Sequence, residues 1–195
     1  MRTYLKPALT LFLCMTILTG IVYPLAVTGI AQLLFSEQAS GSLMKDRQGN
    51  VIGSALIGQN FQEPGYFWSR PSATSPYPYN AAASGGSNLG PLNTVLLENI
   101  KARIKSLKTA DPSSSFSIPV DLVTASASGL DPDISPAAAV YQLKRVAQNR
   151  HVPEAEVQKL IDQLTRKRQG GLLGEPRVNV LLLNRTLDER YGKLE

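Results

Sequence analysis

The feature that most constrains this 195-residue chain is a long N-terminal stretch without charge. No charged residue lies between Lys6 and Glu37, and most of the intervening residues are apolar. About 20 consecutive apolar residues suffice for a helix to cross the hydrocarbon core of a bilayer, so this stretch is long enough. Pro24 is expected to kink the helix, which membrane-spanning helices tolerate. The sequence therefore predicts a membrane anchor over residues 1–36.

A cleaved signal peptide is the alternative interpretation of the same stretch. Signal peptides carry an apolar region of about 7–15 residues that ends at a cleavage site with small residues. The stretch here is longer, and no Ala-x-Ala site closes it. Both observations favour an anchor that stays attached to the chain.

The distribution of cations predicts the direction of the anchor. Arg2, Lys6 and the amino terminus precede the apolar stretch, whereas the first cation after it is Lys45. Flanking segments rich in Lys and Arg stay in the cytoplasm. The sequence therefore predicts a cytoplasmic N-terminus and an extracytoplasmic domain over residues 37–195.

Composition excludes several classes of function. The net charge of +5 is mild and dispersed along the chain, which does not indicate nucleic-acid binding. The only cysteine, Cys14, lies in the apolar stretch, and His151 is the only histidine. A disulfide framework, a Cys-based metal site and a multi-histidine metal site are therefore not expected. His151 lies between two predicted helices and is more simply a surface residue than a catalytic base.

Beyond the anchor, hydrophobic periodicity predicts a small α+β domain. Ser135 followed by Pro136 is typical of a helix start, and this helix is expected to bury Val140, Leu143 and Val146. The expected elements are a β element over 41–65, helices over 92–108, 136–150 and from 153, a strand-like segment over 120–124, a buried central strand over 178–184, and a short terminal helix capped by Thr186 with Glu189.

Residues 66–93 show neither the period of a helix nor the alternation of a strand. The segment is rich in aromatic residues, proline and glycine, and Arg70 is its only charged residue. This composition does not fit disorder, so an ordered loop that presents a surface is expected. Arg70 is expected either to stack on the aromatic rings or to pair with a specific acceptor.

Two loops carry residue types that can serve chemistry. Residues 84–90 are rich in glycine, but they lack the lysine and the Ser or Thr of a phosphate loop, and no nucleophile elbow is present. Asp121, Asp131 and Asp133 lie close in sequence and could serve acid–base chemistry or bind a hard cation. Asp-Pro-Asp is also a common turn, in which Asp131 caps its own backbone. The turn is the simpler interpretation, so we expect no catalytic residue and no metal.

Three runs together resemble the C-subunit family of the Kdp-type bacterial potassium-transporting ATPase. They are YFWSRPSAT with the YN and SGGSNLGP that follow it (66–91), DLVTASASGLDPDISPAAA (121–139) and LGEPRVNVLLLNRTLD (173–188). The resemblance covers essentially the whole chain, including the single N-terminal membrane helix.

This resemblance implies a non-catalytic accessory subunit of a high-affinity, ATP-driven potassium uptake complex in the bacterial inner membrane. Its expected partners are a channel-like potassium-binding subunit, an ATP-hydrolysing subunit and the lipid bilayer. The subunit would support the assembly and activity of the complex and would bind no cofactor directly. The alternative is a catalytic chaperone that binds ATP and raises the ATP affinity of the ATPase subunit. That alternative requires a cytoplasmic domain, against the orientation predicted above.

The candidate site residues fall into two groups. Those expected to bind a partner protein lie in the aromatic loop and are Tyr66, Phe67, Trp68, Arg70, Tyr77, Tyr79 and Asn80. Those of the two motif loops are Ser84, Gly85, Gly86, Ser87, Asn88, Ser126, Ser128, Gly129 and Asp131.

Overall fold

The computed structural model describes residues 2–46 and 48–194, and it confirms a mixed α+β architecture. The chain divides into two compact units, Met1–Ile52 and Gly53–Glu195.

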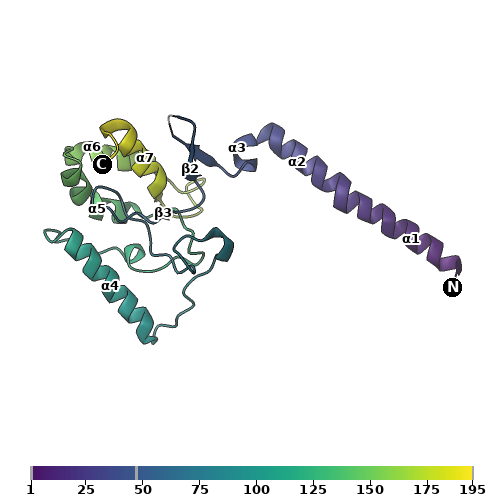
Figure 1. Ribbon diagram of the computed structural model, residues 1–195, viewed down its shortest axis with the longest axis horizontal. Helices are drawn as coiled ribbons and strands as arrows, with labels where there is room; N and C mark the ends of the chain where they lie inside the picture. The colour runs from purple at the N-terminus through teal and green to yellow at the C-terminus, as the bar shows by residue number, and fades with distance from the viewer. Residues whose placement is uncertain (1, 47, 195) are drawn as a thin grey trace. The chain divides into compact units, whose positions relative to one another are not determined.

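The first unit is dominated by one long apolar helix (Figure 1). It consists of α1 (Arg2–Ile17), the π-helical turn η1 (Leu18–Val22) and α2 (Tyr23–Leu34). The described residues contain one helix long and apolar enough to cross a membrane, Thr3–Leu34. Pro24 lies in the first turn of α2, directly after the π-helical turn. Proline has no N–H to donate, and the π-helical turn stands where the regular hydrogen-bond ladder is interrupted.

A short helix and a two-stranded sheet follow the long helix. They are α3 (Ser36–Ala39), β1 (Leu43–Lys45) and β2 (Val51–Ser54). The Asp46 carboxylate organises the turn between the strands, since its Oδ1 accepts from the backbone N–H groups of Gln48 and Asn50 at 2.9 and 2.8 Å. The expected β element is thus confirmed in its first part.

The second unit is built around a small antiparallel sheet. Its strands are β3 (Asp133–Ile134), β4 (Thr165–Arg166) and β5 (Arg177–Asn179), in the order β3-β5-β4. Val178 in the central strand pairs with Ile134 on one side and with Thr165 on the other.

Three helices contact the central strand and bury the core with it. They are α5 (Pro136–Asn149), α6 (Glu154–Leu164) and α7 (Val180–Tyr191), which gather in one region of Figure 1. The Ser135 hydroxyl accepts from the N–H of Ala138 at 3.0 Å and caps α5, as predicted. The largest fully buried side chains are Phe67, Leu122, Ile134, Leu160, Ile161, Leu183, Leu187, Gln142, Val146, Val157, Val178 and Val180.

The prediction of a central strand over 178–184 is wrong after its second residue. The strand ends at Asn179, whose Oδ1 accepts from the N–H of Leu182 at 2.9 Å and caps α7. An apolar run of this length does not distinguish a buried strand from a buried helix, and Asn at an N-cap favours the helix. The predicted cap at Thr186 is also wrong, because Thr186 lies inside α7 and donates to the carbonyl of Leu182 at 2.8 Å.

Two further predictions need correction. Residues 120–124 contain the 3₁₀ turn η3 (Val120–Leu122) instead of a strand. Val140 is 42% exposed, although Leu143 and Val146 are buried as expected. The inward face of α5 includes the polar side chains of Gln142 and Arg145, so apolar spacing alone misplaces that face.

The predicted helix after residue 92 is confirmed as α4 (Thr94–Ala110), capped by the Asn93 side chain. In Figure 1 it runs along the outside of the second unit. Only Leu107 in its last turns is buried, whereas Leu92 and Val95 at the other end are exposed. The apolar stripe therefore packs on the domain only near the C-terminus of α4.

Candidate functional site

The aromatic loop, residues 66–93, has a buried base and an exposed apex. At the base, Phe67 is fully buried and Trp68 is 6% exposed. At the apex, Tyr77 is 58% exposed. The loop is therefore part of the core at one end and part of the surface at the other.

Two side-chain amides hold the base of the loop. Asn184 on α7 accepts from the N–H of Phe67 at 2.8 Å and donates to the carbonyl of Phe67 at 3.0 Å. Gln142 on α5 does the same for Trp68, at 2.8 and 3.1 Å. A side-chain amide carries both a donor and an acceptor. Each of these two amides therefore makes, for one residue of the loop, the two backbone hydrogen bonds that a neighbouring strand would make. Neither residue was predicted from the sequence, where the only signal was a polar residue among the apolar positions of a helix.

Trp68 also lies against two guanidinium groups. The Cζ atoms of Arg145 and Arg103 are 4.6 and 5.3 Å from the centre of its ring, within range for cation–π attraction. Arg145 donates to the carbonyls of Pro64 and Tyr66, and Arg103 donates to the carbonyl of Ser69 at 3.0 Å. Burial lowers the pKa of Arg145 to about 10, so the group still carries its charge at neutral pH.

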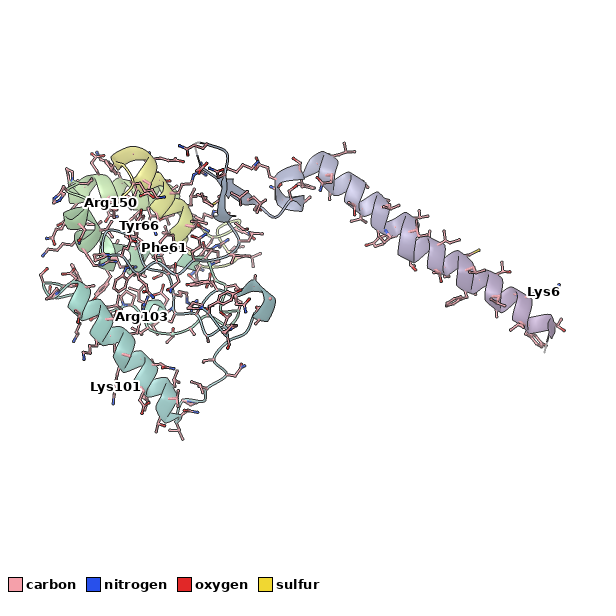
Figure 2. The ribbon with its side chains drawn as sticks, viewed as in Figure 1. Lys6, Phe61, Tyr66, Lys101, Arg103 and Arg150 are labelled. Atoms are coloured by element: carbon pink, nitrogen blue, oxygen red, sulfur yellow. The ribbon has the colours of Figure 1, made fainter. Side chains whose placement is uncertain are left out.

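Tyr66 is anchored by Arg150, directly after α5, and by Asp188 on α7. The Arg150 Cζ is 4.5 Å from the centre of its ring, and the Tyr66 hydroxyl donates to the Asp188 carboxylate at 3.1 Å. Arg150 also donates to Asp188 at 2.8 Å. Burial, and then the charge of Asp188, raises the pKa of Tyr66. Figure 2 labels Tyr66 and Arg150 together with Phe61, whose ring stacks on Tyr66 at 5.7 Å between centroids.

Arg70 is committed to a specific acceptor, which decides between the two expectations for it. Its Nη1 lies 3.0 Å from the Asp131 carboxylate. The Tyr79 hydroxyl donates to the carbonyl of Arg70 at 2.5 Å, and burial raises the pKa of Tyr79. Arg70 therefore joins the aromatic loop to the loop that contains Asp131, and Tyr79 ties the aromatic loop to itself.

Asn80 fixes the apex from within. Its Nδ2 donates to the carbonyl of Ser75 at 2.8 Å, and its Oδ1 accepts from the N–H of Ala82 at the start of η2 (Ala81–Ala83). The buried members of the predicted partner-binding set thus hold the loop in place, and Tyr77 is the aromatic member that presents a surface.

The two motif loops, 84–90 and 125–131, lie side by side. The N–H of Gly85 and the hydroxyl of Ser84 both donate to the carbonyl of Ser128, at 2.9 and 3.0 Å. A Cβ atom at Gly86 would lie 3.0 Å from the carbonyl oxygen of Ala127, and one at Gly129 would lie 2.7 Å from that of Gly85. Glycine at these positions therefore permits the close approach of the two backbones.

Local hydrogen bonds account for the polar residues of the second motif loop. The hydroxyl of Ser126 accepts from the N–H of Gly129 at 2.9 Å, and that of Ser128 accepts from the N–H of Leu130 at 3.1 Å. Asp131 accepts from the N–H of Asp133 at 3.0 Å, which confirms the predicted turn. In the first motif loop, Ser87 and Asn88 are exposed.

The three carboxylates considered for chemistry line a cavity of about 500 Å³, and each has a partner. Asp131 pairs with Arg70, Asp133 lies 3.0 Å from Arg177, and Asp121 accepts from the N–H of Ser135 at 2.7 Å. Burial, and then the charge of Asp131, raises the pKa of Asp133. Over residues 2–46 and 48–194, no group of three or more His, Cys, Asp or Glu side chains could hold a metal ion.

Comparisons with known proteins agree on one family. The family model described as "K+-transporting ATPase, c chain" matches residues 5–189. Three similar relatives are each called a potassium-transporting ATPase KdpC subunit. The relative from Dechloromonas aromatica (strain RCB) is 60% identical over 96% of this chain and 98% of its own length. The one from Polaromonas naphthalenivorans (strain CJ2) is 62% identical over 96% of this chain and 95% of its own length. The one from Herminiimonas arsenicoxydans is 56% identical over 98% of this chain and 100% of its own length.

Proposed function

The chain belongs to the family of the C chain of the K+-transporting ATPase, and from this we propose that it is a non-catalytic accessory subunit that docks on its partner subunits through the aromatic loop. The partners are the channel-like potassium-binding subunit and the ATP-hydrolysing subunit of the same complex. The docked subunit supports assembly and activity, while the chemistry is performed by another chain.

The proposed topology is a single pass through the bacterial inner membrane. Residues 1–36 form the anchor, the N-terminus is cytoplasmic, and residues 37–195 lie outside. The long apolar helix Thr3–Leu34 supports the anchor. The cations Arg2 and Lys6 ahead of that helix, with no further cation before Lys45, support the orientation.

One observation carries the docking proposal: the apex of the aromatic loop is exposed while its base is locked into the core. A loop that is already ordered loses little conformational entropy on binding. Tyrosine is enriched among the residues that dominate binding energy, and Tyr77 is the exposed aromatic side chain of this apex.

The test changes the apex without touching the core. Tyr77→Ser combined with Ala82→Arg removes the aromatic contact and places a cation on the exposed turn η2. We expect binding to the other subunits to weaken about 30-fold, the loss of one strong contact, so that the variant no longer co-purifies with the detergent-solubilised complex. Potassium-stimulated ATP hydrolysis should fall with it.

Phe116→Ser is the matched control, because Phe116 is an exposed aromatic residue outside the loop. It should leave co-purification and ATP hydrolysis unchanged. Docking through the apex is wrong if the Tyr77→Ser, Ala82→Arg variant also co-purifies and supports potassium-stimulated hydrolysis at the wild-type level.

The alternative function, a catalytic chaperone that binds ATP through residues 84–90 or 125–131, depends on the opposite topology. Protease treatment of sealed spheroplasts separates the two, because Arg166, Lys167 and Arg168 are exposed. Cleavage there from outside supports the external domain. Cleavage only after the membrane is breached would place the domain in the cytoplasm and favour the ATP-binding alternative.

A further inference from the structure

The hairpin between β4 and β5 exposes two adjacent leucines at its end. We call residues 169–174 the hairpin tip. Leu172 is 82% exposed and Leu173 is 69% exposed. Single exposed leucines are common on protein surfaces. Two adjacent ones at the end of a hairpin form a small apolar protrusion, most of whose side-chain surface is not covered by the domain.

The hairpin tip is an ordered structure. Gln169 and Leu173 exchange backbone hydrogen bonds at 2.8 and 3.0 Å. Below them, the Arg168 guanidinium lies 2.7 Å from both carboxylate oxygens of Glu175. Gly170 and Gly171 adopt positive φ angles that close the turn. The two leucines are therefore held outward by a fixed turn.

The flanks of the hairpin tip are basic. Arg168 is paired with Glu175, and Arg177 with Asp133. Arg166 and Lys167, the residues that lead from β4 toward the tip, are exposed to solvent. An apolar end bordered by exposed cations is the composition of segments that enter the interface of an anionic bilayer.

We propose that the hairpin tip contacts the lipid bilayer, with Leu172 and Leu173 entering the interfacial region and with Arg166 and Lys167 binding anionic headgroups. This goes beyond the proposed docking function and rests on only one part of it, the membrane anchor. It holds whichever side of the membrane the domain occupies.

The size of the protrusion favours a bilayer over a protein partner. A stable protein interface buries roughly 800 Å² on each partner, far more than two leucine side chains offer. A bilayer accepts single side chains, and a weak contact suffices because the anchor helix of the same chain keeps the domain at high local concentration near the membrane.

The test uses the full chain in vesicles of phosphatidylcholine and phosphatidylglycerol. Cys14, the only cysteine, is replaced by Ser, and Leu172→Cys carries an environment-sensitive nitrobenzoxadiazole probe. Entry of the tip into the bilayer should shift the emission of this probe to the blue, and lipids with a nitroxide on the acyl chain should quench it. The matched control places the same probe at Ala155→Cys, an exposed position on α6, where no quenching is expected.

The cations supply the second measurement. Adding Arg166→Gln and Lys167→Gln to the labelled chain should lower the equilibrium constant for binding of the tip to lipid by about fivefold for each cation lost. Vesicles of phosphatidylcholine alone should have the same effect. The variants keep Arg168 and Glu175, so the turn itself remains pinned.

Three outcomes would overturn the proposal. In the first, the probe at the tip is no more quenched than the control probe. In the second, the quenching at the tip does not change when the cations or the anionic lipid are removed. In the third, a photoreactive group at position 172 crosslinks to another subunit of the complete complex while lipid quenching is absent, which would assign the tip to a protein partner. An apex variant that still docks would overturn the docking proposal and leave all three measurements at the tip unchanged, so the two proposals fail separately.

Discussion

Single polar side chains decide how the aromatic loop is attached. Asn184 and Gln142 each bind both backbone groups of one loop residue, and they come from α7 and α5. The bonds are buried, where an unpaired backbone group is costly. The loop is therefore attached at two consecutive residues, Phe67 and Trp68. This attachment of the base also limits the movement of the apex.

Asn184→Leu tests this attachment directly. Leucine is similar in volume but leaves the N–H and the carbonyl of Phe67 buried without partners. Each unpaired group costs about 1–3 kcal/mol, so the loss of both partners should lower the free energy of unfolding in urea by about 2–6 kcal/mol. Asn99→Leu, at an exposed position of α4, should change it by less than about 0.5 kcal/mol. Equal effects of the two substitutions would show that the amide of Asn184 is not what stabilises the loop.

Trp68 should behave as a core residue. It is buried, and two arginines lie against its ring. Truncation of a buried tryptophan costs about 3–5 kcal/mol, so Trp68→Ala should lower the midpoint of thermal unfolding strongly. Tyr77→Ala at the exposed apex should leave that midpoint nearly unchanged. A Trp68→Ala variant as stable as the wild type would mean that the ring does not contribute to the core.

Asp133 should make the stability of the domain depend on pH. Burial and the charge of Asp131 raise its pKa above 3.8, although Arg177 opposes the shift. The folded state therefore holds the proton more tightly than the unfolded state, and this contribution is lost as pH rises through the raised pKa. We expect the wild type to lose stability relative to Asp133→Asn between pH 4 and pH 7. Urea unfolding of both proteins across that range checks it, and a constant or opposite difference contradicts it.

At the scale of elements, a single cap decides where α7 begins. The Asn179 side chain accepts from the N–H of Leu182, so the helix starts directly after β5. Asn179→Ala should cost about 2 kcal/mol, because it removes the N-cap, typically worth about 1 kcal/mol, and also the hydrogen bond from Nδ2 to the carbonyl of Ala55 at 2.8 Å. Thr186→Ala, at the position that the sequence pattern favours as the cap, should cost less than about 0.5 kcal/mol because Thr186 lies inside the helix. Unfolding in urea distinguishes them, and the reverse order would return the start of the helix to Thr186.

The elements that could be predicted from the sequence are those marked by residues adjacent to one another in the chain. The start of α5 follows from Ser135 and Pro136, which are adjacent. The start of α7 does not, because the apolar run over 178–184 has no period that separates strand from helix. The exposed apex of the loop was predictable from its composition. Its buried base was not, because the side chains that bind it, Gln142 and Asn184, are distant in sequence and reach it only after the helices have packed.

At the scale of the whole molecule, the helix that is apolar enough to cross a membrane and the buried core lie in different parts of the chain. No residue of η1 or α2 is buried within the chain, as expected for a helix whose solvent is lipid. The buried apolar cluster of α5, α6, α7 and β5, together with Phe67 and Trp68 from the loop, lies entirely within Gly53–Glu195. The second unit therefore has its own core, which is the condition for independent folding.

Removal of residues 2–36 tests this division. The shortened chain keeps the whole core and both strands of the β1–β2 sheet, so its free energy of unfolding in urea should match that of the full chain in detergent within about 0.5 kcal/mol. It should also stay in the supernatant after the membranes are sedimented, whereas the full chain should sediment with them. A shortened chain that is unfolded by far-UV circular dichroism would mean that the apolar helix contributes to the fold of the domain as well as to its location.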